Sequence, residues 1–203
     1  MIKEKKMTLP NKLTVARIIM VPIFLVLLTV DFAHHYLYAL LVFIIASLTD
    51  LIDGKIARKY NLITDMGKFL DPLADKMLTT AAFLGFMVCG IGGLAPMMWV
   101  NFIVLTREFL VTSVRYMAAN SGKVVAANIY GKVKTVSQMV AIIAALTFEY
   151  AISLDASLGL GLLGGLPTDI LRITYCVAIW FSTVMTVVSG AVYLYENREF
   201  IKN

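Results

Sequence analysis

Four aspartates lie close together in an otherwise apolar chain. Asp50 and Asp53 close one apolar segment, and Asp71 and Asp75 open the next. A carboxylate in or at the rim of a hydrocarbon layer costs about 2.5–3.5 kcal/mol even on the lenient insertion scale. Four such groups together therefore indicate a compensating cation and a function.

The spacing of these carboxylates suits helices that present them on one face. At about 100° per residue, Asp53 falls beside Asp50, and Asp71 and Asp75 are one turn apart. Oxygen donors of this kind favour Mg²⁺ or Mn²⁺, and paired ions clamp phosphates during in-line displacement. We therefore predict three metal ligands, Asp50, Asp53 and Asp71. We assign Asp75 as a general base that also lies within reach of a metal.

Small and basic residues accompany the carboxylates. Gly54 and Gly67 would let a bulky group approach the backbone closely. Arg58 follows the first acidic pair and could hold a diphosphate through a charge-assisted bond. The local chemistry therefore indicates phosphoryl transfer on a diphosphate substrate.

The elements that position these residues must lie in a membrane. The chain has 203 residues, of which 60% are hydrophobic and 15% charged, and its mean hydropathy is +0.83. These values exclude an ordinary soluble domain. The first apolar run lacks a small-residue cleavage pattern after Val30, so we expect it to stay as an anchor. Cys89 and Cys176 lie in different apolar segments and predict neither a disulfide framework nor a zinc site.

Six apolar runs approach or reach the length that crosses about 30 Å of hydrocarbon. They lie at about 12–32, 36–57, 68–90, 94–117, 132–153 and 170–195. We predict an all-α integral membrane protein with six transmembrane helices in a single domain, 1–203. Pro10 and Asn11 follow a basic tract and predict a short interfacial helix before the first span. A disordered, charged N-terminus is the alternative.

The basic residues indicate topology. Lys and Arg gather in residues 1–17, 55–68, 107–134 and 198–202, and Arg172 departs from this pattern. The positive-inside rule then places both termini and the carboxylates on the cytoplasmic side of the cell membrane. The net charge of +5 is thereby explained without a nucleic-acid partner. His34 and His35 fall on the opposite side and predict an interfacial role.

The pattern D-x2-D-G-x2-A-R-x8-G-x3-D-x3-D, which runs from Asp50 to Asp75, resembles the signature of the CDP-alcohol phosphatidyltransferases without departure. The resemblance implies a two-metal site on the four aspartates, with Asp75 also the base. It further implies a cytidine-nucleotide site, six helices and a homodimer. The implied nucleotide residues are Gly54, Ala57, Arg58 and Gly67. Thr14 would either contact the nucleotide or cap the first helix.

Within the family, the chain looks most like the phosphatidylglycerophosphate synthases. The similar segments are residues 10–17 with Pro22, residues 106–108 with Arg115, and residues 131–135. This likeness implies transfer of the phosphatidyl group of CDP-diacylglycerol to glycerol 3-phosphate, with release of CMP, in phospholipid biosynthesis. The acceptor is a dianion that needs fixed cations. The candidate cations are Arg107, Arg115, Lys132 and Lys134.

Other interpretations stay open on the sequence alone. Within the family, the acceptor could be inositol phosphate, serine or phosphatidylglycerol. Outside it, the aspartates could form the ion site of a cation transporter or a set of structural ion pairs. The four candidate cations could instead serve topology, and Glu108 is predicted to orient a neighbouring cation.

Overall fold

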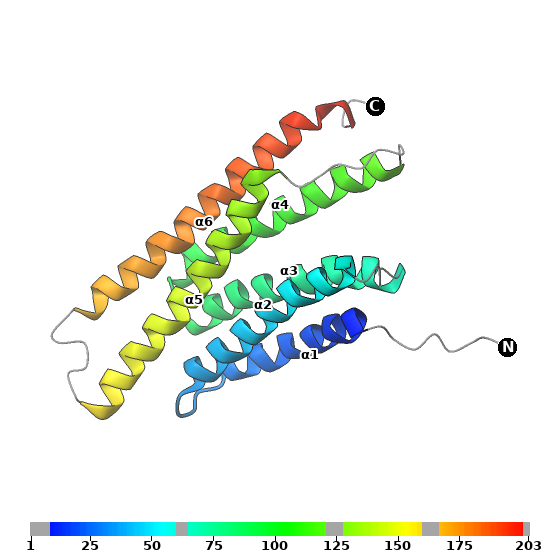
Figure 1. Cartoon of the computed structure of the whole chain (residues 1–203). Coiled ribbons are helices and arrows are strands. Elements are labelled where there is room, and N and C mark those ends of the chain that lie inside the picture. Colours follow the sequence, from blue (N-terminus) through cyan, green and yellow to red (C-terminus); the bar gives the residue numbers. More distant parts are fainter. Residues whose placement is uncertain (1–8, 60–64, 121–127, 160–166, 201–203) are drawn as a thin grey trace. The chain divides into compact units, whose positions relative to one another are not determined.

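The structure is a computed structural model that describes residues 9–59, 65–120, 128–159 and 167–200 (Figure 1). Within these ranges it describes no side chains at 9, 10, 51–59, 65–69, 71, 72, 75, 120 and 200. The helices are α1 (Leu9–Thr29), α2 (His35–Lys59), α3 (Asp65–Cys89), α4 (Leu94–Asn120), α5 (Ile129–Leu158) and α6 (Thr168–Glu196). A 3₁₀ turn, Arg198–Phe200, follows. The described ranges contain no strand, and each predicted apolar run falls mainly on one helix, which confirms the all-α prediction.

Four of these helices are long and apolar enough to cross a membrane. The qualifying stretches are Asn11–Thr29, Leu94–Ala119, Ile129–Leu158 and Thr168–Glu196. Among the described residues, α2 and α3 carry the shorter apolar stretches His35–Asp50 and Lys76–Cys89. The chain is therefore a helical membrane protein with at least these four candidate spans.

The start of the chain differs from the prediction of a separate interfacial helix. Residues 9–14 form the first turns of α1 and continue without a break into its apolar part. Residues 1–8 lie outside the described residues. One continuous helix is favoured here because Asn11 and Thr14 are buried on the same face as the apolar residues that follow.

The chain divides into two compact units, residues 1–82 and 83–203. In the first unit α2 runs back alongside α1 (Figure 1). The buried face of α1 advances by three or four residues at a time, as one stripe of a helix does. It consists of Asn11, Thr14, Arg17, Val21, Phe24 and Leu28. This stripe is polar near the start of α1 and apolar near its end. At the apolar end the ring centroids of Phe24 and of Phe43 on α2 lie 5.8 Å apart.

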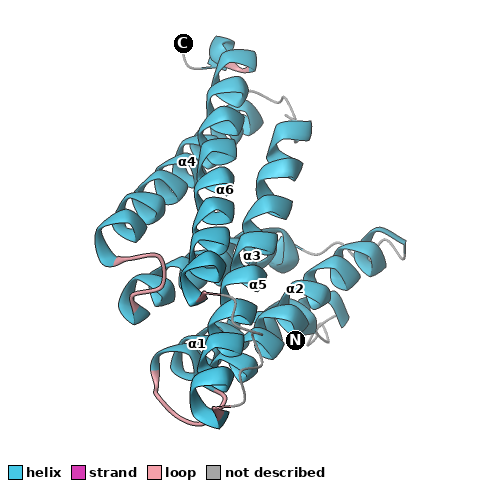
Figure 2. Ribbon diagram, turned by 90° about the vertical axis from the view of Figure 1, so that its left-hand side faces the viewer, coloured by secondary structure: helices cyan, strands magenta, loops and turns pink. Residues whose placement is uncertain are grey.

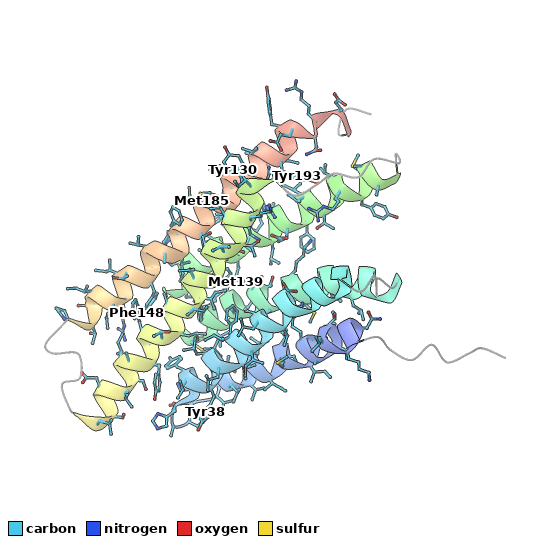
Figure 3. The ribbon with its side chains drawn as sticks, viewed as in Figure 1. Tyr38, Tyr130, Met139, Phe148, Met185 and Tyr193 are labelled. Atoms are coloured by element: carbon cyan, nitrogen blue, oxygen red, sulfur yellow. The ribbon has the colours of Figure 1, made fainter. Side chains whose placement is uncertain are left out.

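In the second unit α6 packs against both α4 and α5 (Figure 2). Asn128 begins α5 by accepting a hydrogen bond from the Gly131 N–H at 3.0 Å. Gly159 ends this helix with φ of 59°, a left-handed conformation that costs glycine little. Tyr193 of α6, labelled in Figure 3, is buried. It packs with Val111 and Val114 of α4.

Two polar pairs fix how α5 and α6 lie against each other. The Gln138 amide donates to Thr186 Oγ1 at 3.2 Å, and Tyr175 donates to Glu149 Oε1 at 2.6 Å. Arg172 Nε lies 3.7 Å from the same Glu149 oxygen. The cation that departs from the positive-inside pattern is therefore paired with a buried carboxylate.

Candidate active site

The predicted carboxylates lie on two consecutive helices. Asp50 and Asp53 belong to α2, and Asp71 and Asp75 belong to α3. The two aspartates of each pair are three or four residues apart, which is the spacing on which the prediction of a shared face rests. Among the side chains that the structure describes, no cluster of at least three His, Cys, Asp or Glu could hold a metal ion. Three of the four predicted ligands lie outside that set, because only Asp50 has a described side chain.

Asp50 of α2 forms an ion pair with a residue of α1. Arg17 Nη1 donates to Asp50 Oδ1 in an ion pair; the Arg17 side chain is 1% exposed and the Asp50 side chain 32% exposed. A buried guanidinium in an apolar helix pair requires such a partner. The sequence analysis missed this pairing. The available signal was that Arg17 lies three residues after Thr14 on a helical face that also carries Asn11.

The predicted nucleotide residues gather around the same two helices and α1. Gly54, Ala57 and Arg58 lie in the last turns of α2, and Gly67 lies in the first turn of α3; their side-chain positions are outside the described set. Thr14 is fully buried on α1. Such burial is typical of a residue that packs helices, and its contact with a nucleotide stays a prediction.

In the second unit two of the four predicted acceptor cations meet on one carboxylate. Arg107 Nη1 of α4 lies 3.0 Å from Glu108 Oε1, and Lys134 Nζ of α5 donates to the same oxygen. These side chains are 13%, 13% and 7% exposed for Arg107, Glu108 and Lys134. Glu108 therefore orients neighbouring cations, as the sequence predicts.

The other two predicted cations lie apart from this pair. Arg115 is exposed, two turns beyond Arg107 on α4. Lys132 is exposed and lies two residues from Lys134, on the opposite side of α5, because two residues turn a helix by about 200°. Lys132 lines a shallow apolar groove of about 430 Å³. The other residues of the groove are Val133, Val136, Ser137, Val140, Ala178 and Phe181.

Ser189 of α6 is a site candidate that the sequence analysis missed. Its Oγ accepts a hydrogen bond from Arg107 Nη2 at 2.7 Å across 82 residues of sequence. The neighbouring Gly190 leaves room for Arg107, since a Cβ there would lie 3.0 Å from Arg107 Cγ. Arg107 Nε is buried and has no hydrogen-bond partner among the described residues.

Known proteins are similar in sequence to this chain over most of its length. Residues 7–188 match the model of the CDP-alcohol phosphatidyltransferase family. A Bacillus subtilis protein named CDP-diacylglycerol–glycerol-3-phosphate 3-phosphatidyltransferase is 39% identical, with 96% of this chain and 97% of the relative covered. A Rickettsia typhi protein of the same name is 32% identical over 91% of this chain and 94% of its own. A Mycobacterium tuberculosis protein named probable phosphatidylglycerophosphate synthase is 41% identical over 66% of this chain and 63% of its own. The chain therefore belongs to the CDP-alcohol phosphatidyltransferase family, as its carboxylate signature predicts.

Proposed function

We propose that this chain transfers the phosphatidyl group of CDP-diacylglycerol to glycerol 3-phosphate and releases CMP, in the biosynthesis of phosphatidylglycerol. The observation that carries this proposal is the 39% identity to a relative of that name over 96% of the chain. The complete carboxylate signature supports the phosphotransfer chemistry of this proposal. The names of two relatives include glycerol 3-phosphate. They favour this acceptor for the chain over inositol phosphate, serine or phosphatidylglycerol. Membership of a transferase family disfavours the cation transporter.

In the proposed reaction, the primary hydroxyl of glycerol 3-phosphate attacks the lipid-linked phosphorus of CDP-diacylglycerol. A new P–O bond forms as the bond to the CMP oxygen breaks, so no covalent enzyme intermediate is needed. Asp75 takes the proton of the attacking hydroxyl. Orientation of the two substrates by the helices supplies a large share of the rate in this kind of transfer.

Asp50, Asp53, Asp71 and Asp75 are the residues that would hold two Mg²⁺ or Mn²⁺ ions. An all-carboxylate donor set fits hard divalent cations, and Asp50 keeps acceptor capacity because Arg17 bonds one of its oxygens. When bound, such ions offset the charge of a diphosphate and of its leaving group. Gly54, Ala57, Arg58, Gly67 and Thr14 would bind the cytidine nucleotide.

The acceptor phosphate is assigned to the second unit. Arg107 and Lys134 are the main members of this set, because Lys134 is buried, Arg107 is only 13% exposed, and Glu108 pairs with both. The guanidinium still has a buried Nε–H without a partner in the described part of the chain, and a phosphate oxygen is a suitable acceptor for it. Arg115 and Lys132, both exposed, would add positive potential rather than fixed contacts.

The finer description of the protein also belongs to the proposal. Six helices would cross the cell membrane in a single domain, with both termini and the active site on the cytoplasmic side. The distribution of Lys and Arg along the sequence supports this orientation. The family resemblance supports a homodimer.

One assay tests the proposed function. Purified protein in detergent with CDP-diacylglycerol and Mg²⁺ is offered labelled glycerol 3-phosphate, inositol phosphate, serine and phosphatidylglycerol in separate reactions. CMP release and a labelled lipid product are expected with glycerol 3-phosphate. Turnover with another alcohol but not with glycerol 3-phosphate would overturn the assigned acceptor.

A further inference from the structure

Ser189 and Gly190 lie side by side on the face of α6 that meets α4, and both contact Arg107. We propose that these two residues position the Arg107 guanidinium for the acceptor phosphate. This inference rests on the proposed function, because it gives Arg107 an anion to bind. Neither residue needs to touch the substrate, so both are positioning residues.

Ser189 differs from the buried serine and threonine hydroxyls Ser182, Thr183 and Thr186 of α6 because its hydrogen-bond partner is a cation. Ser182, Thr183 and Thr186 donate to carbonyl oxygens of α6 itself, at 2.8, 2.9 and 2.7 Å. Thr186 Oγ1 also accepts from the neutral Gln138 amide of α5, whereas Ser189 Oγ accepts from the charged Arg107 Nη2 of α4. A serine that only packs a helix interface has no need of a cation, so this bond favours a role in orienting Arg107.

Gly190 sets where the Arg107 stem can lie. A Cβ at position 190 would lie 3.0 Å from Arg107 Cγ, closer than nearly all real Cβ contacts, so the arginine would have to shift. At Gly131 of α5 a Cβ would lie 3.7 Å from Arg107 Nη2, which is ordinary contact. The arginine is thus confined tightly on the α6 side and more loosely on the α5 side.

Together these contacts reduce the freedom of a long side chain before substrate arrives. Glu108 holds Nη1 at 3.0 Å and Ser189 holds Nη2 at 2.7 Å, which fixes the plane of the guanidinium. Arginine otherwise loses considerable rotamer entropy when it is immobilised. Fixing it in the free enzyme lowers the cost of binding the acceptor, which is the advantage of preorganisation.

The test is a pair of KM values, for glycerol 3-phosphate and for CDP-diacylglycerol, measured on purified full-length variants. Ser189→Ala should raise the KM for glycerol 3-phosphate about tenfold and leave that for CDP-diacylglycerol within twofold. Ser189→Thr keeps the hydroxyl and should restore most of the loss. Gly190→Ala should raise the same KM at least as much, and Gly131→Ala by less.

Ser182→Ala is the matched control, since it removes a buried hydroxyl from the same helix without touching Arg107. A second readout uses inorganic phosphate as a competitor of glycerol 3-phosphate. In Ser189→Ala the inhibition constant of phosphate should rise by the same factor as the KM for glycerol 3-phosphate. In Ser182→Ala it should stay unchanged. If Ser189 only supported the fold, Ser189→Ala would not change the KM for glycerol 3-phosphate and the inhibition constant of phosphate while sparing the KM for CDP-diacylglycerol.

Three outcomes separate this inference from the proposed function. If wild-type protein uses glycerol 3-phosphate and Ser189→Ala matches it in both KM values, the positioning role is wrong and the function stands. Equal losses for both substrates would likewise overturn the positioning role. If wild-type protein does not use glycerol 3-phosphate at all, the proposed function fails first, and the inference falls with it.

Discussion

Arg17 on α1 and Asp50 on α2 form an ion pair in which the cation is almost fully buried and the carboxylate is about one-third exposed. The pair joins a residue of the predicted metal site to a helix outside the carboxylate signature. We expect Arg17→Gln and Asp50→Asn to be coupled in a double-mutant cycle of thermal stability, by about 0.5–3 kcal/mol. Strictly additive losses in detergent would contradict a direct interaction.

Replacing Asp53 or Asp71 by Asn should abolish CMP release while the protein still folds and inserts. A neutral amide is a much weaker ligand for a hard divalent cation than a carboxylate. Asp31→Asn is the control, because this aspartate is exposed in the connection before α2. A variant at position 53 or 71 with more than about a tenth of wild-type turnover at saturating Mg²⁺ would exclude that residue as an essential ligand.

Removal of divalent ions should stop the reaction reversibly. Treatment with EDTA should eliminate CMP release, and Mg²⁺ or Mn²⁺ should restore it, because four carboxylates around a diphosphate repel one another without a cation. The melting temperature, measured in parallel, reports whether the ions also support the fold. Full turnover in the presence of EDTA would refute the metal requirement.

Arg107→Lys tests whether charge alone suffices at the acceptor site. Lysine keeps the charge but cannot bond Glu108 and Ser189 as a planar fork, so kcat/KM for glycerol 3-phosphate should fall about ten- to a hundredfold. Lys134→Met should cause a comparable loss. Lys132→Met should cause a smaller one, because Lys132 lies on the other side of α5. A larger loss at position 132 than at 134 would reverse the ranking that burial suggests.

Tyr175→Phe should lower stability without changing the chemistry. The phenol donates to the buried Glu149 carboxylate at 2.6 Å, and a hydrogen bond to a charged group contributes about 1.5–3 kcal/mol. Thermal unfolding in detergent measures the loss, and CMP release per folded molecule should be unchanged. Tyr116→Phe, at an exposed position on α4, is the control. Lost turnover with unchanged stability would point to a role in catalysis instead.

Features that depend on local sequence patterns, such as the positions of the helices and the family signature, were predicted correctly. Helix boundaries differ from the predicted ones by a few residues, because capping decides them; α5 begins at Ile129, ahead of the predicted residue 132, since Asn128 caps it. The family followed from the resemblance of residues 50–75 to a known signature, and the family match over residues 7–188 confirms it.

The sequence alone did not predict contacts between residues that are far apart in the chain. Ser189 is 82 residues from Arg107, and nothing in the local pattern around Ser189 indicates a cation partner. The separation of Lys132 from Lys134 could have been predicted, because neighbours two apart on a helix face opposite ways. The interpretation of both as phosphate ligands gave more weight to their charge than to that geometry.

Two contacts between α1 and α2 determine the position of Asp50 along this helix pair. Phe24 meets Phe43 and Arg17 meets Asp50, so the two contacts lie seven residues apart on each helix. Seven residues span about 10.5 Å, close to two turns. These two contacts fix how α1 and α2 align, because sliding α1 by one turn would break the Arg17–Asp50 ion pair and separate the two aromatic rings at the same time. The position of Asp50 along the α1–α2 pair is thus set by α1, a helix outside the carboxylate signature, so α1 would help to align the proposed metal site.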